Sequence, residues 1–104
     1  MDEFKQIATL DRLIHEPSRL AIMAVLSAVE NADFTFLLTA TQLSKGNLSA
    51  HAAKLRDAGY VRIDKSFKDN YPHTTYKLTA EGRKAFKRYH QQVKRLTRKL
   101  DQSG

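Results

Sequence analysis

One short segment carries side chains suited to contact a nucleic acid. It reads Gly46-Asn47-Leu48-Ser49-Ala50-His51, so an amide, a hydroxyl and an imidazole follow in close succession. These groups can hydrogen-bond base edges or phosphate oxygens, whereas nearby lysines can neutralise phosphates. Small side chains in the same stretch would let the backbone approach DNA closely. The DNA-contacting residues predicted here are Lys45, Gly46, Asn47, Ser49, Ala50, His51, Ala53 and Lys54.

Three of these residues also have a purely structural explanation. Asn47 could cap its own helix, Ser49 could be an ordinary exposed residue, and His51 could be half buried and support packing. The spacing of Leu48, Ala52 and Leu55 places these three side chains on one helical face, directed at the core. The intervening positions then face outward.

The charge distribution favours a polyanionic partner. The 104 residues include 18 Lys and Arg and 11 Asp and Glu, which gives a formal net charge of +7. Counting each segment gives −3 for residues 1–44 (3 basic, 6 acidic), +4 for 45–80 (7 and 3) and +6 for 81–104 (8 and 2). A positive field over residues 45–104 suits nucleic acid. A solubilising helix face would show the same excess.

The composition excludes several other kinds of chemistry. The sequence has no cysteine, so disulfides, thiolate metal sites and cysteine nucleophiles are excluded. His15, His51, His73 and His90 show no paired ligand spacing, and we expect neither a metal nor a cofactor. No phosphate-binding loop, nucleophile elbow or metalloprotease motif occurs, so we predict that the protein is not an enzyme.

The hydropathy pattern indicates a cytoplasmic protein with no membrane partner. No apolar run approaches the roughly 18 residues that a membrane span needs. The first residues, Met1-Asp2-Glu3-Phe4-Lys5, are acidic and mixed, unlike a secretory signal.

Apolar periodicity predicts a helical first half. Helices are expected over residues 3–14, 17–30 and 35–43, with Thr35 as the cap of the third. After a tight turn at 44–47, a fourth helix should end at Gly59, because glycine favours the left-handed conformation that follows a helix.

A β-hairpin should follow the fourth helix. Residues 60–67 and 74–78 alternate apolar with polar, and the polar stretch 68–73 should connect them. A helix-turn-helix pair followed by a hairpin is the winged-helix arrangement, an α+β fold that is mainly helical. We predict that Lys65, Lys68, His73 and Thr75 of this wing contact DNA, although a solvated hairpin would also explain these residues.

The last helix, expected over residues 80–100 and capped by Thr79, carries an apolar stripe. Its spacings of 3, 4, 3 and 4 form a heptad pattern. At about 1.5 Å per residue this helix is roughly 30 Å long, so its distal turns need a partner helix. The stripe gives the predicted dimerisation residues Phe86, Tyr89, Val93, Leu96 and Leu100.

Three segments together follow a known pattern. They are His15–Ile22, Leu43–Val61 and Thr75–Arg83, and the similarity extends over residues 10–95. They resemble the winged helix-turn-helix transcriptional regulators of the ArsR/MarR type, in particular the small stand-alone members. Metal-sensing members use cysteine thiolates or His/Asp clusters, which this sequence lacks.

The resemblance implies one winged-helix domain over residues 1–104. Its helix-turn-helix would occupy 34–59, its wing 60–78, and its dimerisation helices 1–15 and 80–100. The first of these helices would add Phe4 and Ile7 to the dimerisation residues. It also implies a homodimer that binds double-stranded DNA sequence-specifically and regulates transcription, with repression as the commoner mode. A protein–protein interaction module and an RNA-binding winged helix remain alternatives, and the sequence identifies no effector.

Overall fold

The computed structural model describes residue 5 and residues 7–103. It confirms an α+β, mainly helical winged-helix fold. The elements follow in the order α2 (Pro17–Ser27), β1 (Ala32–Asp33), α3 (Phe34–Thr41), α4 (Lys45–Asp57), β2 (Val61–Lys68), β3 (Tyr71–Leu78) and α5 (Ala80–Ser103).

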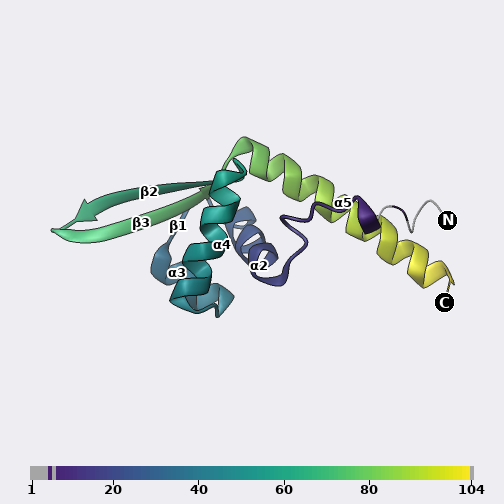
Figure 1. The fold of residues 1–104 in the computed structure, drawn as a ribbon, viewed down its shortest axis with the longest axis horizontal. Coiled ribbons are helices and arrows are strands. Elements are labelled where there is room, and N and C mark those ends of the chain that lie inside the picture. The colour runs from purple at the N-terminus through teal and green to yellow at the C-terminus, as the bar shows by residue number, and fades with distance from the viewer. Residues whose placement is uncertain (1–4, 6, 104) are drawn as a thin grey trace.

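The molecule is elongated because two elements project from a small centre. In Figure 1, α2, α3 and α4 lie together, the β2–β3 hairpin extends to one side and α5 runs to the other. The extents are 57 × 24 × 21 Å and the radius of gyration is 15.7 Å. A compact domain of this length would have a radius of gyration of about 13 Å. Much of the hairpin and of α5 therefore lacks cover from the other described residues.

The core lies where α2, α3, α4 and the base of the sheet meet. The three-stranded sheet has the order β1-β3-β2, with both pairs antiparallel. Leu48, Ala52 and Leu55 of α4 are fully buried, as their spacing predicts. Other fully buried side chains come from the turns before α2, from α2, from α3 and from the start of β2: Ile14, Ile22, Met23, Leu26, Leu37 and Val61.

The N-terminal helix is shorter than predicted. Of the described residues before α2, only 5, 7 and 8 are helical, and 9–16 form a series of turns. The Asp11 side chain is the physical reason, because its Oδ1 accepts the backbone N–H of Leu13 at 2.9 Å and of Ile14 at 3.4 Å. Such local bonds compete with helix continuation. Phe4 lies outside the described residues.

Carboxylates cap two helices, and one of them corrects a prediction. Glu16 accepts the N–H of Ser18 and Arg19 at the start of α2, where Pro17 occupies the first turn. Asp33, not Thr35, caps α3, because its Oδ1 accepts the Phe36 N–H at 2.7 Å. The prediction of Thr35 as this cap is therefore wrong.

The hairpin is longer and its turn tighter than predicted. The strands pair from Val61 with Leu78 out to Lys68 with Tyr71, so only Asp69 and Asn70 form the connection. Both have positive φ, 52° and 68°, which a two-residue turn matched to strand twist requires. The predicted polar loop over 68–73 is wrong, because most of its residues extend the two strands.

Helix α5 begins in close contact with the turn that ends α4. Gly59, with φ +83°, ends α4 as predicted, and Thr79 Oγ1 donates to its carbonyl oxygen at 2.5 Å. The same hydroxyl accepts the Gly82 N–H at 2.9 Å, so Thr79 caps α5 as predicted. A Cβ on Gly82 would lie 2.1 Å from the Tyr60 carbonyl oxygen. Only glycine permits this approach of two backbones.

Candidate nucleic-acid interface

Helix α4 presents a face that the other described residues leave uncovered. Six of the eight α4 residues predicted to contact DNA are exposed, and two are half buried. The buried leucines hold the opposite face against α2 and α3, and so fix the direction of the exposed one. The exposed six are Lys45, Gly46, Asn47, Ser49, Ala50 and Lys54.

The start of α4 leaves the Asn47 side chain unused by the fold. Ser44 is the N-cap, and its Oγ accepts the Asn47 backbone N–H at 3.1 Å. The alternative in which Asn47 caps its own helix is therefore wrong. Asn47 lies in the first turn and is exposed, so its amide can both donate and accept hydrogen bonds outside the protomer.

Gly46 has no structural reason within the protomer to be glycine. A Cβ built at this position meets no heavy atom within 4 Å, and its φ is not positive. Glycine inside a helix is less favourable than alanine by about 1 kcal/mol. The missing side chain is compatible with a ligand that approaches the α4 backbone closely.

His51 connects the exposed face of α4 to the start of α2. Its Nδ1 lies 3.1 Å from Arg19 Nη1 and 3.7 Å from Glu16 Oε2. Because a guanidinium can only donate, Nδ1 accepts this hydrogen bond and the neutral ring carries its proton on Nε2. His51 is half buried, so the structure supports the packing explanation for this residue.

Glu16 is the centre of this cluster. Burial raises the pKa of its carboxyl, but the backbone N–H groups of Arg19 and Ser18, together with the charged Arg19 side chain, bring the pKa below its usual value. Arg19 Nε also donates to the Leu13 carbonyl at 2.6 Å. Arg19 thus ties the turns before α2 to the α4 helix.

The wing separates its predicted DNA contacts onto two faces. Side chains alternate along a strand, and paired residues point to the same side. Lys65 pairs with Thr74, and both side chains lie on the face that looks toward α4. The other three predicted residues, Lys68, His73 and Thr75, lie on the opposite face. The structure does not bring the four together.

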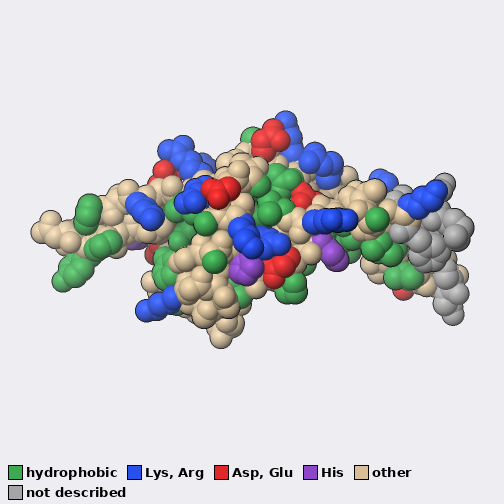
Figure 2. Space-filling view, in the orientation of Figure 1, with side chains coloured by type: hydrophobic (Ala, Val, Ile, Leu, Met, Phe, Trp, Pro, Cys, Tyr) green, Lys and Arg blue, Asp and Glu red, His purple; other side chains and the backbone are tan. Residues whose placement is uncertain are grey.

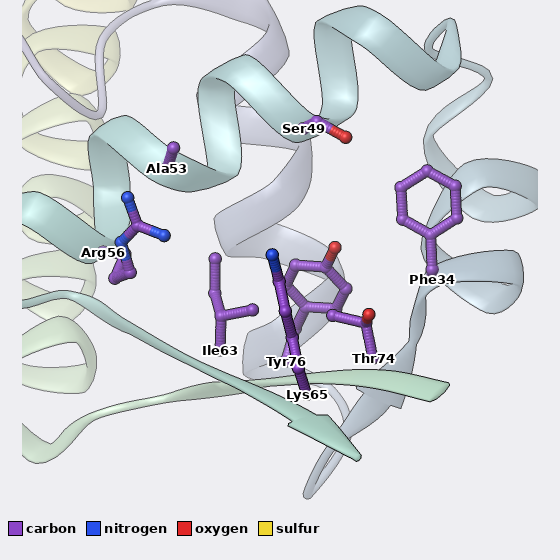
Figure 3. Close-up of a pocket in the computed structure, with 8 residues that line it drawn as sticks. All are labelled: Phe34, Ser49, Ala53, Arg56, Ile63, Lys65, Thr74 and Tyr76. Atoms are coloured by element: carbon purple, nitrogen blue, oxygen red, sulfur yellow. The ribbon is translucent and has the colours of Figure 1, made fainter. Parts of the chain in front are cut away.

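A groove of about 300 Å³ separates α4 from the wing (Figure 3). Ser49, Ala53 and Arg56 line it from α4, and Lys65 rises toward them from β2. Its remaining lining comes from Phe34, Ile63, Thr74 and Tyr76. Two cationic side chains flank the groove, as suits an anionic ligand. Arg56 is not among the residues predicted from the sequence, although its position one turn after Ala53 could have identified it.

The α5 stripe comprises Phe86, Tyr89, Val93, Leu96 and Leu100, and from Tyr89 onward it becomes more exposed toward the end of the helix. Tyr89 is 5% exposed and packs inside the protomer, with its hydroxyl 2.7 Å from His15 Nδ1. It thus belongs to the core of the protomer, which differs from its predicted place in a dimer contact. Leu96 is half buried, whereas Leu100 is 54% exposed. Near the other end of the chain, Ile7 is 48% exposed.

Basic side chains spread over a large part of the surface. Figure 2 shows Lys and Arg at the base of the wing, over α4 and along α5. The charge of Arg62 is partly compensated, because its Nε lies 3.0 Å from Asp64 Oδ2 on the same strand. Lys45, Lys54 and Lys65 are exposed.

The described residues contain neither a candidate metal site nor a membrane-spanning helix. Within residues 5 and 7–103, no three His, Asp or Glu side chains gather in a way that could hold a metal ion. No helix in this part of the chain is both long and apolar enough to cross a membrane.

These features define a winged helix DNA-binding protein. Residues 18–97 match the family of winged helix DNA-binding domains, and the chain belongs to this family. It is 31% identical over 90 residues to an uncharacterized protein of Methanocaldococcus jannaschii, a match that covers 86% of this chain and 98% of that protein.

Solved structures agree with this assignment. The chain is similar to the transcriptional regulator homologue protein from Pyrococcus horikoshii, with a TM-score of 0.87, 31% identity and coverage of 97% of this chain and 99% of that one. It also resembles a MarR family transcriptional regulator from Streptomyces coelicolor, whose structure was determined in complex with DNA. There the TM-score is 0.68 and the identity 18%, over 94% of this chain and 68% of that chain, which shows a shared fold.

Proposed function

We propose that the protein is a homodimeric transcriptional regulator that binds a palindromic site in double-stranded DNA in the cytoplasm, and that it acts as a repressor. The exposed face of α4 carries this proposal. That face combines hydrogen-bonding side chains at Asn47 and Ser49 with flanking lysines and with an unhindered backbone at Gly46. A major groove admits a helix with such a face.

The proposed contacts divide into base reading and phosphate neutralisation. Asn47 and Ser49 would hydrogen-bond base edges, whereas Lys45, Lys54 and Lys65 would neutralise phosphates. His51 would support α4 from its bond with Arg19, with its Nε2–H left as a donor. Arg56 extends the cationic rim of the groove between α4 and the wing.

The proposed dimer rests on the apolar surface that the protomer leaves uncovered. Leu100 and Ile7 are exposed, Leu96 is half buried, and the monomer is more extended than its length requires. Pairing two copies of α5 would bury this surface. A two-fold axis would then place two α4 helices in successive major grooves, about 34–36 Å apart, so the site should be palindromic. Repression is proposed because it is the commoner mode among the regulators that the sequence resembles.

Selection from a random duplex pool tests the proposal. The protein is expected to enrich a palindromic site, and its affinity should fall steeply with salt because several phosphates are neutralised. Asn47→Ala and Ser49→Ala should weaken binding to the enriched site more than binding to unrelated duplex. An equal loss on all sequences would remove the base-reading role.

Two other results would favour the alternative functions. Binding that is weak, independent of sequence and lost at physiological salt would indicate a protein–protein interaction module. Stronger competition by single strands or RNA hairpins than by duplex DNA would indicate an RNA-binding winged helix. In vitro transcription from a promoter that contains the enriched site would distinguish repression from activation.

A further inference from the structure

The tip of the wing is apolar and exposed. Phe67 is 78% exposed and Tyr71 75%, higher than the other exposed large apolar side chains of the described residues. Figure 2 shows hydrophobic side chains near this end of the molecule, remote from the core. Neither residue packs against the hydrophobic core, so the fold does not explain two aromatic rings at this position.

The charge at the tip does not suit a phosphate contact. Lys68 is followed directly by Asp69, and residues 67–72 contain no other charged side chain, so the tip is formally neutral. The positive φ angles of Asp69 and Asn70 show that these two residues serve the turn. What the tip offers a ligand is therefore mainly apolar surface.

Phe67 lies on the same face of the wing as Lys65. Along β2, Ile63, Lys65 and Phe67 point to one side, and the first two line the groove beside α4. The cross-strand partner of Phe67 is Pro72, whose ring is conformationally fixed. Tyr71 pairs with Lys68 and points to the other side. The tip thus has a Phe67–Pro72 face toward the α4 side and a Tyr71 face away from it.

The spacing between Lys65 and Phe67 along β2 can be compared with the dimensions of the DNA minor groove. Phe67 lies two residues beyond Lys65, or about 7 Å along the strand. The minor groove of B-DNA is about 7.5 Å deep and about 6 Å wide, too narrow for a two-stranded ribbon but wide enough for a side chain. With Lys65 at the phosphates that border the groove and the wing lying across it, the Phe67 ring would point into the groove, because both side chains project from the same face.

We propose that the wing tip is an apolar wedge: Phe67, supported by Pro72, inserts at a base step in the minor groove next to the α4 contact and partly unstacks it. This inference rests on the proposed binding of duplex DNA. Apolar side chains that insert in this way kink the duplex toward the major groove. Flexible pyrimidine–purine steps kink most readily, so the wedge would prefer such a step without a hydrogen bond to any base.

Unstacking can be measured directly on the selected duplex. A series of duplexes would carry 2-aminopurine at single positions on each side of the palindrome centre. Binding of the wild-type dimer is expected to raise the fluorescence at one step in each half-site. Phe67→Ala should abolish this rise and weaken binding roughly tenfold, in the range that loss of aromatic–base stacking produces. Tyr71→Ala is the matched control, because it removes an equally exposed ring from the opposite face and should change neither value.

A charged variant separates the wedge from an electrostatic contact. Phe67→Lys adds a cation at the tip, so it would strengthen binding if the tip met phosphates. The wedge requires the opposite result, weaker binding without a fluorescence rise. Because Phe67 is exposed, both variants should unfold at the wild-type temperature.

Three outcomes would overturn the wedge. One is wild-type binding to the duplex with no fluorescence change at any step. Another is an equal effect of Phe67→Ala and Tyr71→Ala. The third is loss of self-association in Phe67→Ala without DNA, because the tip would then contact another copy of the chain. Failure of the wild-type protein to bind any duplex would instead refute the proposed function itself.

Discussion

Tyr60 donates a hydrogen bond of 2.6 Å from its hydroxyl to Asp11 Oδ2, which joins the turns before α2 to the residue that follows α4. Asp11 uses its other oxygen to accept the Leu13 N–H at 2.9 Å. One carboxylate therefore fixes both the local turn and its attachment to the winged-helix body. The hydrogen bond to Asp11 is the larger cause, and burial the next, that together raise the pKa of Tyr60 from 10.0 to about 12.

This contact predicts a loss of stability in alkali. A pKa that is higher in the folded state contributes stability that is complete below the unfolded pKa, near 10, and is lost as pH rises to about 12. Urea unfolding at pH 7 to 12 should show this decline. Tyr60→Phe should lower the free energy of unfolding at pH 7 by about 1–2 kcal/mol and make the alkaline decline shallower.

Some alkaline dependence should remain in that variant. Burial also raises the pKa of Tyr76 and Tyr89, so both contribute with the same sign. A Tyr60→Phe protein whose stability falls as steeply above pH 10 as that of the wild type would show that the Asp11 contact does not contribute.

Gly82→Ala is expected to destabilise the fold by about 1–3 kcal/mol, measured by urea or thermal unfolding. The added methyl group would lie 2.1 Å from the Tyr60 carbonyl oxygen, a backbone atom that cannot rotate away. Relief would require α5 to move off the α4–β2 turn. Wild-type stability in this variant would mean that the contact is loose in solution.

Gly46→Ala should separate stability from binding. With nothing within 4 Å of the new Cβ, the folded protein should be as stable as the wild type, or more stable by up to about 1 kcal/mol. Its affinity for the selected duplex should fall, because the methyl group would hinder approach of the DNA to α4. Fluorescence anisotropy measures the affinity, and unchanged affinity would refute close approach at this position.

Leu96→Lys should shift the protein from dimer to monomer in sedimentation experiments at micromolar concentration. The substitution places a charge in the distal α5 stripe, where the half-buried leucine would otherwise meet the partner helix. Gln91→Lys is the matched control, because Gln91 is exposed and lies on the opposite side of α5. An unchanged dimer in Leu96→Lys would show that the chains do not associate through this stripe.

Periodicity was sufficient to predict the winged-helix order of elements and the buried face of α4. Leu48, Ala52 and Leu55 are buried where a period of 3.6 places them. The ends of elements were predicted less well, because single side chains determine them. Asp11 and Asp33 redirect the backbone through local hydrogen bonds that no periodic pattern contains.

The proposed DNA-contacting face of α4 was predicted from the sequence more completely than that of the β2–β3 wing. A helix face follows from spacing alone, whereas the faces of a hairpin depend on register. The two-residue turn at Asp69 and Asn70 sets that register and places His73 and Thr75 on the face opposite Lys65. The Arg19–His51 contact joins residues 32 positions apart, a tertiary relationship that no local pattern reveals.

The tight junction at Gly82 has a consequence for the spacing of DNA half-sites. Because α5 is fixed to the end of α4 at this point, α5 acts as a lever arm of about 30 Å between the dimer contact and the recognition helix. A rotation of about 5° at the dimer contact would displace each recognition helix by about 3 Å, close to one base-pair step. In the proposed dimer, the crossing angle of the two α5 helices thus determines how many base pairs separate the half-sites.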